Sequence, residues 1–352
     1  MDGVFETETA SKLGSLRPAA DRILQIQKAD GAIPWFEDGA WDPWNHTESA
    51  MALCVFGEYE AAAKAFDHLA RTQRGDGAWF GEYGNALPMV DRDYISREKA
   101  PSLLDSNFCA YPALGVAHYL KVTRDMERVR AWWPTIQRAL DFVLTLQRED
   151  GSFSWSQEAV GTDDDDALLA GNASIAKSLE CGIYLARAFD QPSHIWQAAR
   201  RALIAALRNK PDLFDRGGKG ARFAMDWYYP VLAGCVPLDH AESRIDAGWQ
   251  TFVIPERGCR CVSDEPWVTI AETAELILAL LCIGDRTRAK NLFEQIEAYR
   301  DHDGAFWMGW QSEEKIYWPR ERPSWTQAAV ILAADALHSE TAGSQVLTTS
   351  LL

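Results

Sequence analysis

Apolar residues recur along most of this chain at positions i, i+3, i+4 and i+7, which is the period of an amphipathic helix. We find no run that alternates between apolar and polar residues as a half-buried strand would. The pattern therefore predicts an all-α protein with two interleaved sets of six helices. The first set covers about residues 12–28, 59–74, 127–148, 193–209, 240–252 and 286–300. The second set covers about residues 46–57, 105–122, 172–189, 226–236, 268–283 and 324–338.

The two sets of helices differ in composition. Residues 128–143, in the first set, carry charged residues on one face, whereas residues 274–283, in the second set, are apolar nearly all round. A helix without a polar face must be enclosed by other elements. An outer ring of amphipathic helices around an inner ring of buried helices satisfies both patterns, so we predict a single-domain (α/α)6 toroid of six helical hairpins. It covers residues 12–338, and residues 1–11 and 339–352 are expected to be loose tails.

One short phrase recurs where helices of the first set end. It reads Gln27-Lys-Ala-Asp-Gly-Ala-Ile33, Gln73-Arg-Gly-Asp-Gly-Ala-Trp79 and Gln147-Arg-Glu-Asp-Gly-Ser-Phe153, and a fourth copy, Arg300-Asp-His-Asp-Gly-Ala-Phe306, lacks only the glutamine. Glycine in the Asp-Gly pair can adopt a positive φ and end a helix, and the residue two places later can fold back onto it. The repeat indicates a stack of one supersecondary unit.

Composition and charge narrow the possible partners. The chain has 352 residues and a formal net charge of −16, with acids spread along its length, which disfavours nucleic acid. No apolar run reaches the roughly 18 residues of an integral membrane span, and the N-terminus is acidic rather than basic, so we expect a cytoplasmic protein. Seven cysteines, several of them in apolar helical runs, agree with that. A homo-oligomer is possible.

In such a toroid the inner helices begin at one face, so the segments before them converge on a central cavity. These segments combine acids, amides and aromatic residues, and Asp42, Asp105, Asp226 and Ser324 fit N-cap positions, where acids and serine are favoured for structural reasons alone. Capping does not explain the aromatic residues beside them, which indicate a binding surface. The candidate substrate-binding residues are Trp41, Trp44, His46, Asn107, Tyr111, Asn172, Trp227, Tyr228, Asp264, Trp267, Trp310 and Trp325.

The repeated phrase, Gln-x-x-Asp-Gly-x-Trp in its fullest copy, resembles the QW repeat of the prenyltransferase and squalene-hopene (terpene) cyclase superfamily, over about residues 12–338. The resemblance implies an isoprenoid-acting enzyme, terpene cyclase-like or prenyltransferase-like. It also implies that a hydrocarbon substrate lies in the aromatic cavity. Squalene-hopene-type cyclases carry Asp-x-Asp-Asp at an inner mouth, and Asp163, Asp165 and Asp166 match it, with Asp165 as the implied proton donor.

The sequence lacks the zinc-binding motif of one branch of this superfamily. Prenyltransferase β-subunits bind zinc through Asp-x-Cys, which is absent here, and Cys259-Arg-Cys261 with Asp264 is the nearest substitute. No phosphate-binding loop is present, and no cofactor is evident. A magnesium ion is expected only if the substrate is a diphosphate.

Two other functions fit the same architecture. Inverting glycosidases of the toroid type place two carboxylates across the cavity and stack tryptophans on sugar rings. Asp105, Asp226, Asp264 or Glu272 could supply that pair, and the mixed polar and aromatic rim suits a neutral sugar. Alternatively, the toroid is a non-catalytic binding scaffold. The substrate expected from the sequence is therefore a small molecule, either an isoprenoid or a sugar.

Overall fold

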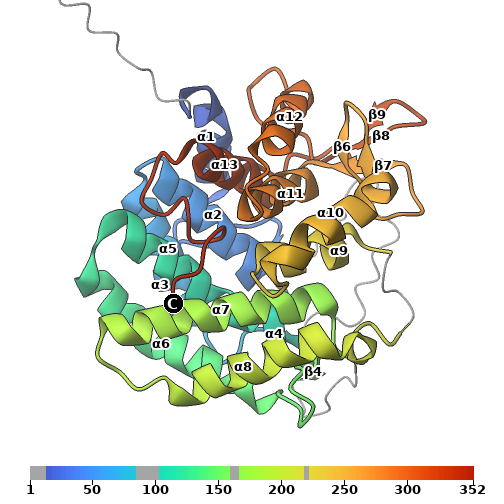
Figure 1. The fold of residues 1–352 in the computed structure, drawn as a ribbon. Coiled ribbons are helices and arrows are strands. Elements are labelled where there is room, and N and C mark those ends of the chain that lie inside the picture. The colour runs from blue at the N-terminus through green and yellow to red at the C-terminus, as the bar shows by residue number, and fades with distance from the viewer. Residues whose placement is uncertain (1–12, 85–102, 159–165, 218–221) are drawn as a thin grey trace, which may run out of the picture.

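The computed structural model describes residues 13–84, 103–158, 166–217 and 222–352, and its helices form two concentric rings (Figure 1). The inner ring consists of α2 (Pro43–Val55), α4 and α5 (Ser106–Ala110 and Pro112–Thr123), α7 (Leu169–Ala188), α9 (Ala224–Leu232), α11 (Ile270–Cys282) and α13 (Ser324–His338). The outer ring consists of α1 (Arg17–Ile26), α3 (Tyr59–Thr72), α6 (Met126–Thr145), α8 (His194–Asn209), α10 (Leu238–Phe252) and α12 (Arg286–Ile296). This confirms the predicted assignment of the two sets.

The ring is closed. Each inner helix packs against the next in chain order, and the last, α13, packs against the first, α2. At this seam the backbone N–H of Ser324 donates to the carbonyl of Trp35 (3.0 Å), and its hydroxyl donates to the carbonyl of Pro34 (2.8 Å). The predicted single-domain (α/α)6 toroid is therefore confirmed.

The second inner helix departs from the predicted single run over 105–122. It divides into α4 and α5, with Tyr111 between them and Pro112 opening α5. Proline has no N–H to donate to the preceding turn, and its ring clashes with the carbonyl four residues earlier. Tyr111 is consequently presented at a break in the helix, on the axis side of the ring, where its hydroxyl reaches Glu48 of α2 (2.8 Å).

Short strands lie around the cavity mouth, although the sequence predicted none. They pair as β1 (Ala40–Trp41) with β2 (Tyr83–Gly84), β3 (Leu103–Asp105) with β4 (Ser156–Glu158), and β5 (Val253–Ile254) with β6 (Gly258–Cys259); β8 (Gly309–Gln311) lies between β7 (Trp267–Thr269) and β9 (Ile316–Tyr317). Strands of two or three residues are too short to show alternation in a sequence. The pairs β1–β2, β3–β4 and β7–β8 join the loops of neighbouring hairpins, whereas β5–β6 and β8–β9 each pair within one loop.

The repeated phrase joins neighbouring outer helices. Each glutamine amide donates both to the carbonyl of the phrase glycine and to a carbonyl of the next outer helix: Gln27 to Ala61 (2.8 Å), Gln73 to Thr135 (2.9 Å) and Gln147 to Ala199 (3.0 Å). In the fourth copy the Arg300 guanidinium replaces the amide and donates to the carbonyl of Ser15 (2.9 Å). The phrase is therefore a structural clasp, and arginine can replace its glutamine.

The glycine of the phrase is required by both conformation and space. Gly77 has a φ of +93°, and a Cβ placed on it would lie 2.3 Å from the carbonyl oxygen of Arg138 in the next outer helix. Gly31 and Gly151 adopt the same conformation against the same kind of carbonyl. Only glycine allows this approach without strain.

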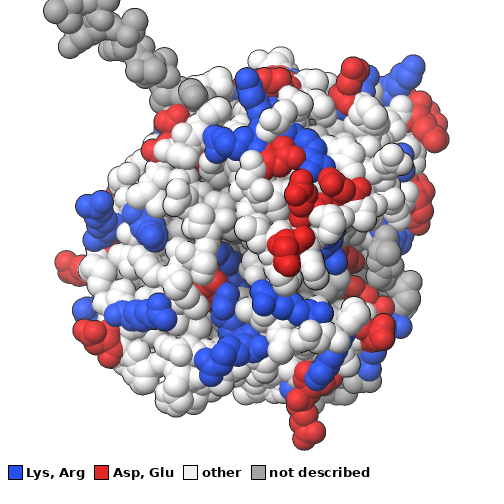
Figure 2. Space-filling model, viewed as in Figure 1, with Lys and Arg blue, Asp and Glu red and all other residues white. Residues whose placement is uncertain are grey.

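The C-terminal segment after α13 is packed rather than loose, which differs from our expectation for residues 339–352. Val346 and Leu347 are buried in the core. The Lys177 ammonium donates to the carbonyl of Thr349 (2.7 Å), and the N–H of Leu351 donates to the Glu180 carboxylate (3.0 Å). The segment thus ends beside α7 on the face shown in Figure 1, and Figure 2 shows both acidic and basic side chains on that face.

Two observations bear on the setting of the chain. In the part of the chain that the structure describes, no helix has the length and apolar character needed to cross a bilayer. All seven cysteines carry free thiols, and five of them are buried.

Candidate active site

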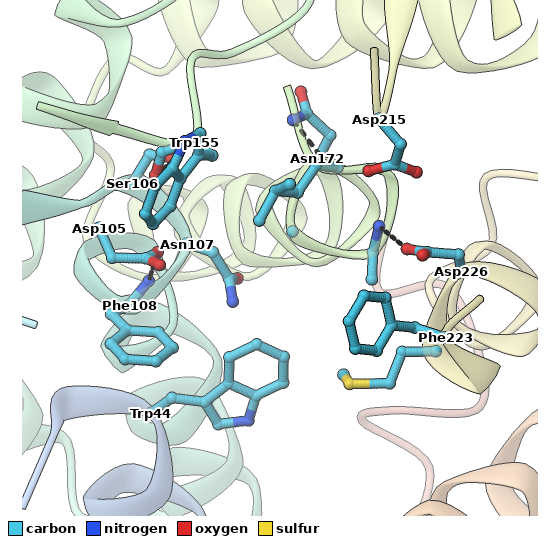
Figure 3. Close-up of a pocket in the computed structure, with 14 residues that line it drawn as sticks. Trp44, Asp105, Ser106, Asn107, Phe108, Trp155, Asn172, Asp215, Phe223 and Asp226 are labelled. Carbon is cyan, nitrogen blue, oxygen red and sulfur yellow. Dashed lines mark hydrogen bonds between the residues drawn. The ribbon is translucent and has the colours of Figure 1, made fainter. Parts of the chain in front are cut away.

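A central cavity of about 290 Å³ opens where the inner helices begin (Figure 3). Its polar lining residues are Asp105, Ser106, Asn107, Asn172, Asp215 and Asp226, and its aromatic lining residues are Trp44, Phe108, Trp155 and Phe223. A second hollow, which we call the floor pocket, shares Trp44, Phe108 and Met225 with the central cavity and adds Glu48, Glu272, Glu275 and Trp325. Acids and aromatic rings from distant parts of the sequence therefore surround one space.

A simple positional rule places these side chains. The second residue of every inner helix lines the central cavity or the floor pocket, as listed for all six: Trp44, Asn107, Ala170, Met225, Ala271 and Trp325. The third residue does so in five of them, including Asp226 and Glu272. Because residues one turn apart share a face of a helix, the sixth residue points the same way at greater depth.

Asp105 forms one wall of the cavity. It precedes α4, and its Oδ1 accepts from the backbone N–H of Phe108 (2.9 Å). Burial raises the pKa of Asp105 to about 7, opposed by hydrogen bonds from the amides of Phe108 and Asn107, and the nearby carboxyl of Asp42 raises it further. Asp105 is thus both the predicted cap and a cavity acid.

Asp226 lies on the opposite side of the cavity from Asp105 (Figure 3). It is 8% exposed, and its Oδ1 accepts from the N–H of Ala170 (3.3 Å). Burial raises the pKa of Asp226 to about 7, and the neighbouring carboxyl of Asp215 raises it further, against the attraction of Arg244. A carboxyl in this setting holds its proton near neutral pH.

Trp44 lies between these two walls at the base of the cavity (Figure 3). Its ring stacks on Tyr111 with centroids 5.0 Å apart and meets Phe108 edge-on. The Trp44 Nε1–H and the Tyr111 hydroxyl both donate to Oε1 of Glu48, each at 2.8 Å. These contacts fix the indole, so it offers a rigid apolar surface to a ligand.

A second layer of polar side chains lies one turn deeper, at the sixth positions of the inner helices. It contains Glu48, Tyr111, Tyr229 and Glu275. Burial raises the pKa of Glu48 to about 7, and it raises the pKa of Glu275 well above its ordinary value, with the nearby carboxyl of Glu48 raising the pKa of Glu275 further. At neutral pH the floor of the cavity therefore holds carboxyls that keep their protons in a large fraction of the molecules.

Asn107 carries an open hydrogen-bonding position. The residue is 4% exposed, and its Oδ1 has no hydrogen-bond partner. Figure 3 shows its amide directed into the cavity between Asp105 and Trp44. Buried polar atoms are nearly always paired, so this oxygen is available to a hydroxyl donor of a ligand.

The fourth residue of the inner helix binds the repeated phrase in α2, α4, α7 and α13. Asn172 accepts from the N–H of Phe153 (2.8 Å) and donates to its carbonyl (3.0 Å), and Gln327 makes the same pair of bonds to Phe306. His46 accepts from the N–H of Ile33 (3.0 Å), and burial lowers its pKa to about 3. His46 and Asn172, both predicted to bind substrate, thus have their polar atoms engaged by the backbone, although Asn172 also borders the cavity.

The other predicted binding residues divide between the core and the rim. Trp41 is stacked on Tyr83 in the core, and Trp227 is stacked on Phe252 with its Nε1–H donated to Arg244. The Tyr228 hydroxyl is bonded to Glu275.

Trp310 packs edge-on against Tyr317 at the rim. Trp325 lines the floor pocket. Trp267 lines a separate groove. Asp264 is exposed and paired with Arg222 (2.9 Å), which holds the pKa of that carboxyl below its ordinary value.

The acidic run at residues 163–166 gives little support to the proton donor expected from the cyclase motif. Asp163 and Asp165 lie outside the described residues. Asp166 does not line the cavity; its carboxylate accepts from the amides of Arg216 (3.1 Å) and Gly217 (3.0 Å), and these bonds outweigh burial and lower its pKa. Asp166 therefore stabilises a loop as an anion.

No described residues form a cluster of three or more histidine, cysteine, aspartate or glutamate side chains arranged to hold a metal ion. In the Cys259-Arg-Cys261 motif, Cys259 is fully buried, and its thiol is directed at the carbonyl of Arg260 (3.3 Å). Burial raises the pKa of Cys261 beyond its ordinary range. Neither thiol is in a setting that favours the thiolate a metal would need.

Several cavity residues were missed from the sequence, namely Glu48, Phe108, Trp155, Asp215, Phe223 and Glu275. Glu48 and Glu275 lie within apolar helices, where a single acid resembles ordinary variation. The available signal was their spacing, since each lies four residues after the cavity-facing second position of its helix.

Comparison with known proteins shows the family. No protein-family model matches the chain. The chain is 43% identical over 330 residues to the MMP endo-(1,4)-3-O-methyl-alpha-D-mannosidase of Mycolicibacterium hassiacum, covering 94% of this chain and 88% of that protein.

Similar solved structures share the fold. They include a wild-type glycosidase (TM-score 0.70, 15% identity, 93% of this chain and 96% of that one) and a rhamnose-bound rhamnosidase from Klebsiella oxytoca (TM-score 0.63, 17% identity, 92% and 64%). A D-mannose isomerase also matches (TM-score 0.66, 13% identity, 96% and 100%).

These findings overturn the expected isoprenoid chemistry. The inferred membership of the prenyltransferase and terpene cyclase superfamily is wrong, and so is the prediction of a terpene cyclase-like or prenyltransferase-like enzyme. The physical reason is that the phrase on which the resemblance rested clasps outer helices and leaves the cavity chemistry open. The carbohydrate alternative agrees with the comparisons. At 43% identity over nearly its whole length, the chain belongs to the family of the Mycolicibacterium hassiacum endo-mannosidase.

Proposed function

We propose that the protein is an inverting glycoside hydrolase that cleaves α-mannosidic bonds within a 3-O-methylated mannan. The observation that carries this proposal is the pair of cavity carboxyls, Asp105 and Asp226, on opposite sides of a space floored by Trp44 (Figure 3). Hydrolysis with inversion requires an acid and a base on opposite faces of one sugar ring. The relative named above acts on (1,4)-linked 3-O-methyl-α-D-mannose, which suggests the substrate.

Asp226 is assigned as the general acid. Its burial and its neighbour Asp215 hold the pKa near 7, so a large fraction of the carboxyl carries a proton at neutral pH. That proton passes to the glycosidic oxygen as the bond from this oxygen to the anomeric carbon breaks.

Asp105 is assigned as the general base. Burial raises the pKa of Asp105 to about 7, so about half of these carboxyls are ionised at neutral pH, and hydrogen bonds from the backbone amides of Phe108 and Asn107 favour that ionised form. In that form it takes a proton from a water molecule that attacks the anomeric carbon from the other face. The two products are a shortened chain with a free reducing end of inverted configuration and the departing chain with its hydroxyl restored.

Other cavity groups orient the sugar. The fixed indole of Trp44 offers a face for a pyranose ring, and Oδ1 of Asn107 can accept from a sugar hydroxyl. The protonated carboxyls of Glu48 and Glu275 can donate hydrogen bonds from the floor once the sugar reaches them.

The test is hydrolysis of 3-O-methylated (1,4)-α-mannan, followed by size analysis of the products and by proton NMR of the new reducing ends during the first minutes. We expect internal cleavage, β-configured new ends, and loss of activity in Asp105→Asn and Asp226→Asn. New ends that retain the α configuration would exclude the inverting assignment. Absence of cleavage would exclude the substrate.

The free thiols suggest where the activity takes place. Seven unpaired cysteines, most of them buried, agree with a reducing compartment, so we place the enzyme in the cytoplasm. Fractionation of cells that express the tagged full-length chain tests this assignment, which recovery in an extracellular or envelope fraction would contradict.

A further inference from the structure

A third hollow, which we call the flanking groove, lies beside the central cavity and has no role in the mechanism above. Its volume is about 650 Å³, more than twice that of the central cavity. Phe223 lines both spaces, so one aromatic ring separates them. On another side Cys261 lines the groove, and its thiol is close enough to Glu272 of the floor pocket for that carboxyl to raise the pKa of the thiol further than burial does alone. The groove is therefore contiguous with the site that would hold the reacting sugar.

The walls of the groove are mostly apolar. They include Trp267, Trp318, Val262, Pro266 and Ile316. Trp267 and Trp318 meet edge to face with centroids 5.1 Å apart, and the Trp267 Nε1–H donates to the carbonyl of Trp318 (2.7 Å). Ile316, at the start of β9, is 49% exposed. A half-exposed isoleucine beside two tryptophans forms an apolar surface of the kind that marks a binding site.

Polar groups are present at the edges of this surface. Arg222, Glu265, Gln311 and Glu314 line it, and Arg222 is paired with Asp264 (2.9 Å). Apolar walls with a few polar groups are typical of ligand sites.

The groove is also rigidly connected to the cavity wall. Phe223 forms an isolated bridge with Val262, Arg260 forms another with Val268 of β7, and β7 pairs with β8, which pairs with β9. Side chains on these segments keep fixed distances from Phe223 and from the acids beyond it.

We propose that the flanking groove binds the O-methylated sugar units next to the one in the central cavity, and that its apolar wall selects methylated over unmethylated chains. This proposal rests on the proposed function. An enzyme that cuts within a chain must hold sugars beyond the reacting one. A 3-O-methyl group replaces a hydroxyl donor with an apolar surface, which suits indole and isoleucine rather than charged side chains.

The main test compares Ile316→Ser and Trp318→Ala with the wild type on three substrates: a long methylated oligomannoside, the matching unmethylated chain, and a short activated aryl mannoside that fills only the central cavity. We expect KM for the long methylated chain to rise about tenfold in each variant, with kcat within twofold. The short substrate should be unaffected, and the preference for methylated chains should fall. Ile195→Ser is the matched control, because Ile195 is 61% exposed on α8 and lines neither the cavity nor the groove.

Calorimetric titration separates this proposal from the proposed function. The Asp226→Asn protein, with and without each groove variant, is titrated with the long methylated chain. A tenfold weaker Kd in the double variants supports the groove even if the wild type cleaves no mannan. Equal loss on the long and short substrates, or an unchanged Kd, overturns the proposal.

Discussion

The assignment of Asp226 as the general acid predicts that the damage caused by Asp226→Asn depends on the leaving group. At pH 7 a carboxyl with a pKa of about 7 is protonated in about half of the molecules. An aspartate with the ordinary value of 3.8 would be protonated in about one molecule in 1,600. The folded environment therefore raises the population of the active acid several hundredfold, and the substitution removes that acid while it keeps the shape of the side chain.

The expected magnitude follows from general acid catalysis, which contributes on the order of 10²–10⁴ in rate, or about 3–5 kcal/mol in the barrier. For the mannan, whose sugar leaving group needs a proton, kcat/KM should fall by that factor. For a dinitrophenyl mannoside, whose phenolate leaves without a proton, the loss should be less than about tenfold. The alkaline limb of the wild-type pH profile should lie near pH 7, because activity is lost as the acid deprotonates, and the variant should lack this limb.

The assay is steady-state hydrolysis of both substrates between pH 5 and 9, with Asp335→Asn as the control. Asp335 is also a buried aspartate with a raised pKa, but it bonds to Thr341 at the end of α13 and lines neither hollow of the site. The control should keep wild-type rates on both substrates. Equal loss of both activities in Asp226→Asn would refute the assignment, because a residue that only shapes the cavity does not discriminate between leaving groups.

Three further outcomes follow from the structure. Asp215→Asn keeps the acceptor for the N–H of Leu169 but removes a neighbouring negative charge, so the alkaline limb of the pH profile should move to lower pH, and an unmoved limb would contradict the coupling of the two acids. Gly77→Ala should lower the free energy of unfolding by about 2–4 kcal/mol in urea titration, whereas Gly75→Ala, which has open space, should change it little. Lys177→Met removes one partner of the buried Glu180 carboxylate and should cost about 3 kcal/mol by the same titration.

The architecture could be predicted because it depends on periodic features. The helical period and the contrast between amphipathic and fully apolar helices reflect burial, which acts on every turn of every helix. The structure departs from the prediction where a single local feature sets the backbone conformation. Pro112 divides the second inner helix, and two-residue strands at the cavity mouth leave no alternation to detect.

The site could be predicted only in part. Asp105, Asp226, Glu272, Trp44 and Asn107 all line the hollows, because each is the N-cap or the second or third residue of an inner helix. His46 and Asn172 lie one or two positions further along, and because each position turns by about 100° around the helix, their polar atoms face the repeated phrase. Polar character does not mark the cavity-facing position, because the second residues are mostly tryptophan, alanine or methionine, whereas polar side chains such as His46 and Gln327 occupy fourth positions for structural reasons.

In each repeat, the residues that hold the helices together and the residues that line the cavity occupy different positions. This is why the sequence predicted the fold correctly and the function wrongly. The phrase Gln-x-x-Asp-Gly contacts carbonyls of outer helices and the fourth residues of inner helices, so any toroid that needs this clasp can keep it whatever it binds. The cavity is lined instead by Asp105, the N-cap of α4, by second and third inner positions, and by the sixth positions of α2 and α11. In this chain they supply acids with raised pKa values and an unpaired amide oxygen, groups that act on hydroxyls and glycosidic oxygens. A hydrocarbon offers such donors and acceptors nothing to bind, so these positions, rather than the phrase, should be compared when a function is assigned to a toroid of this kind.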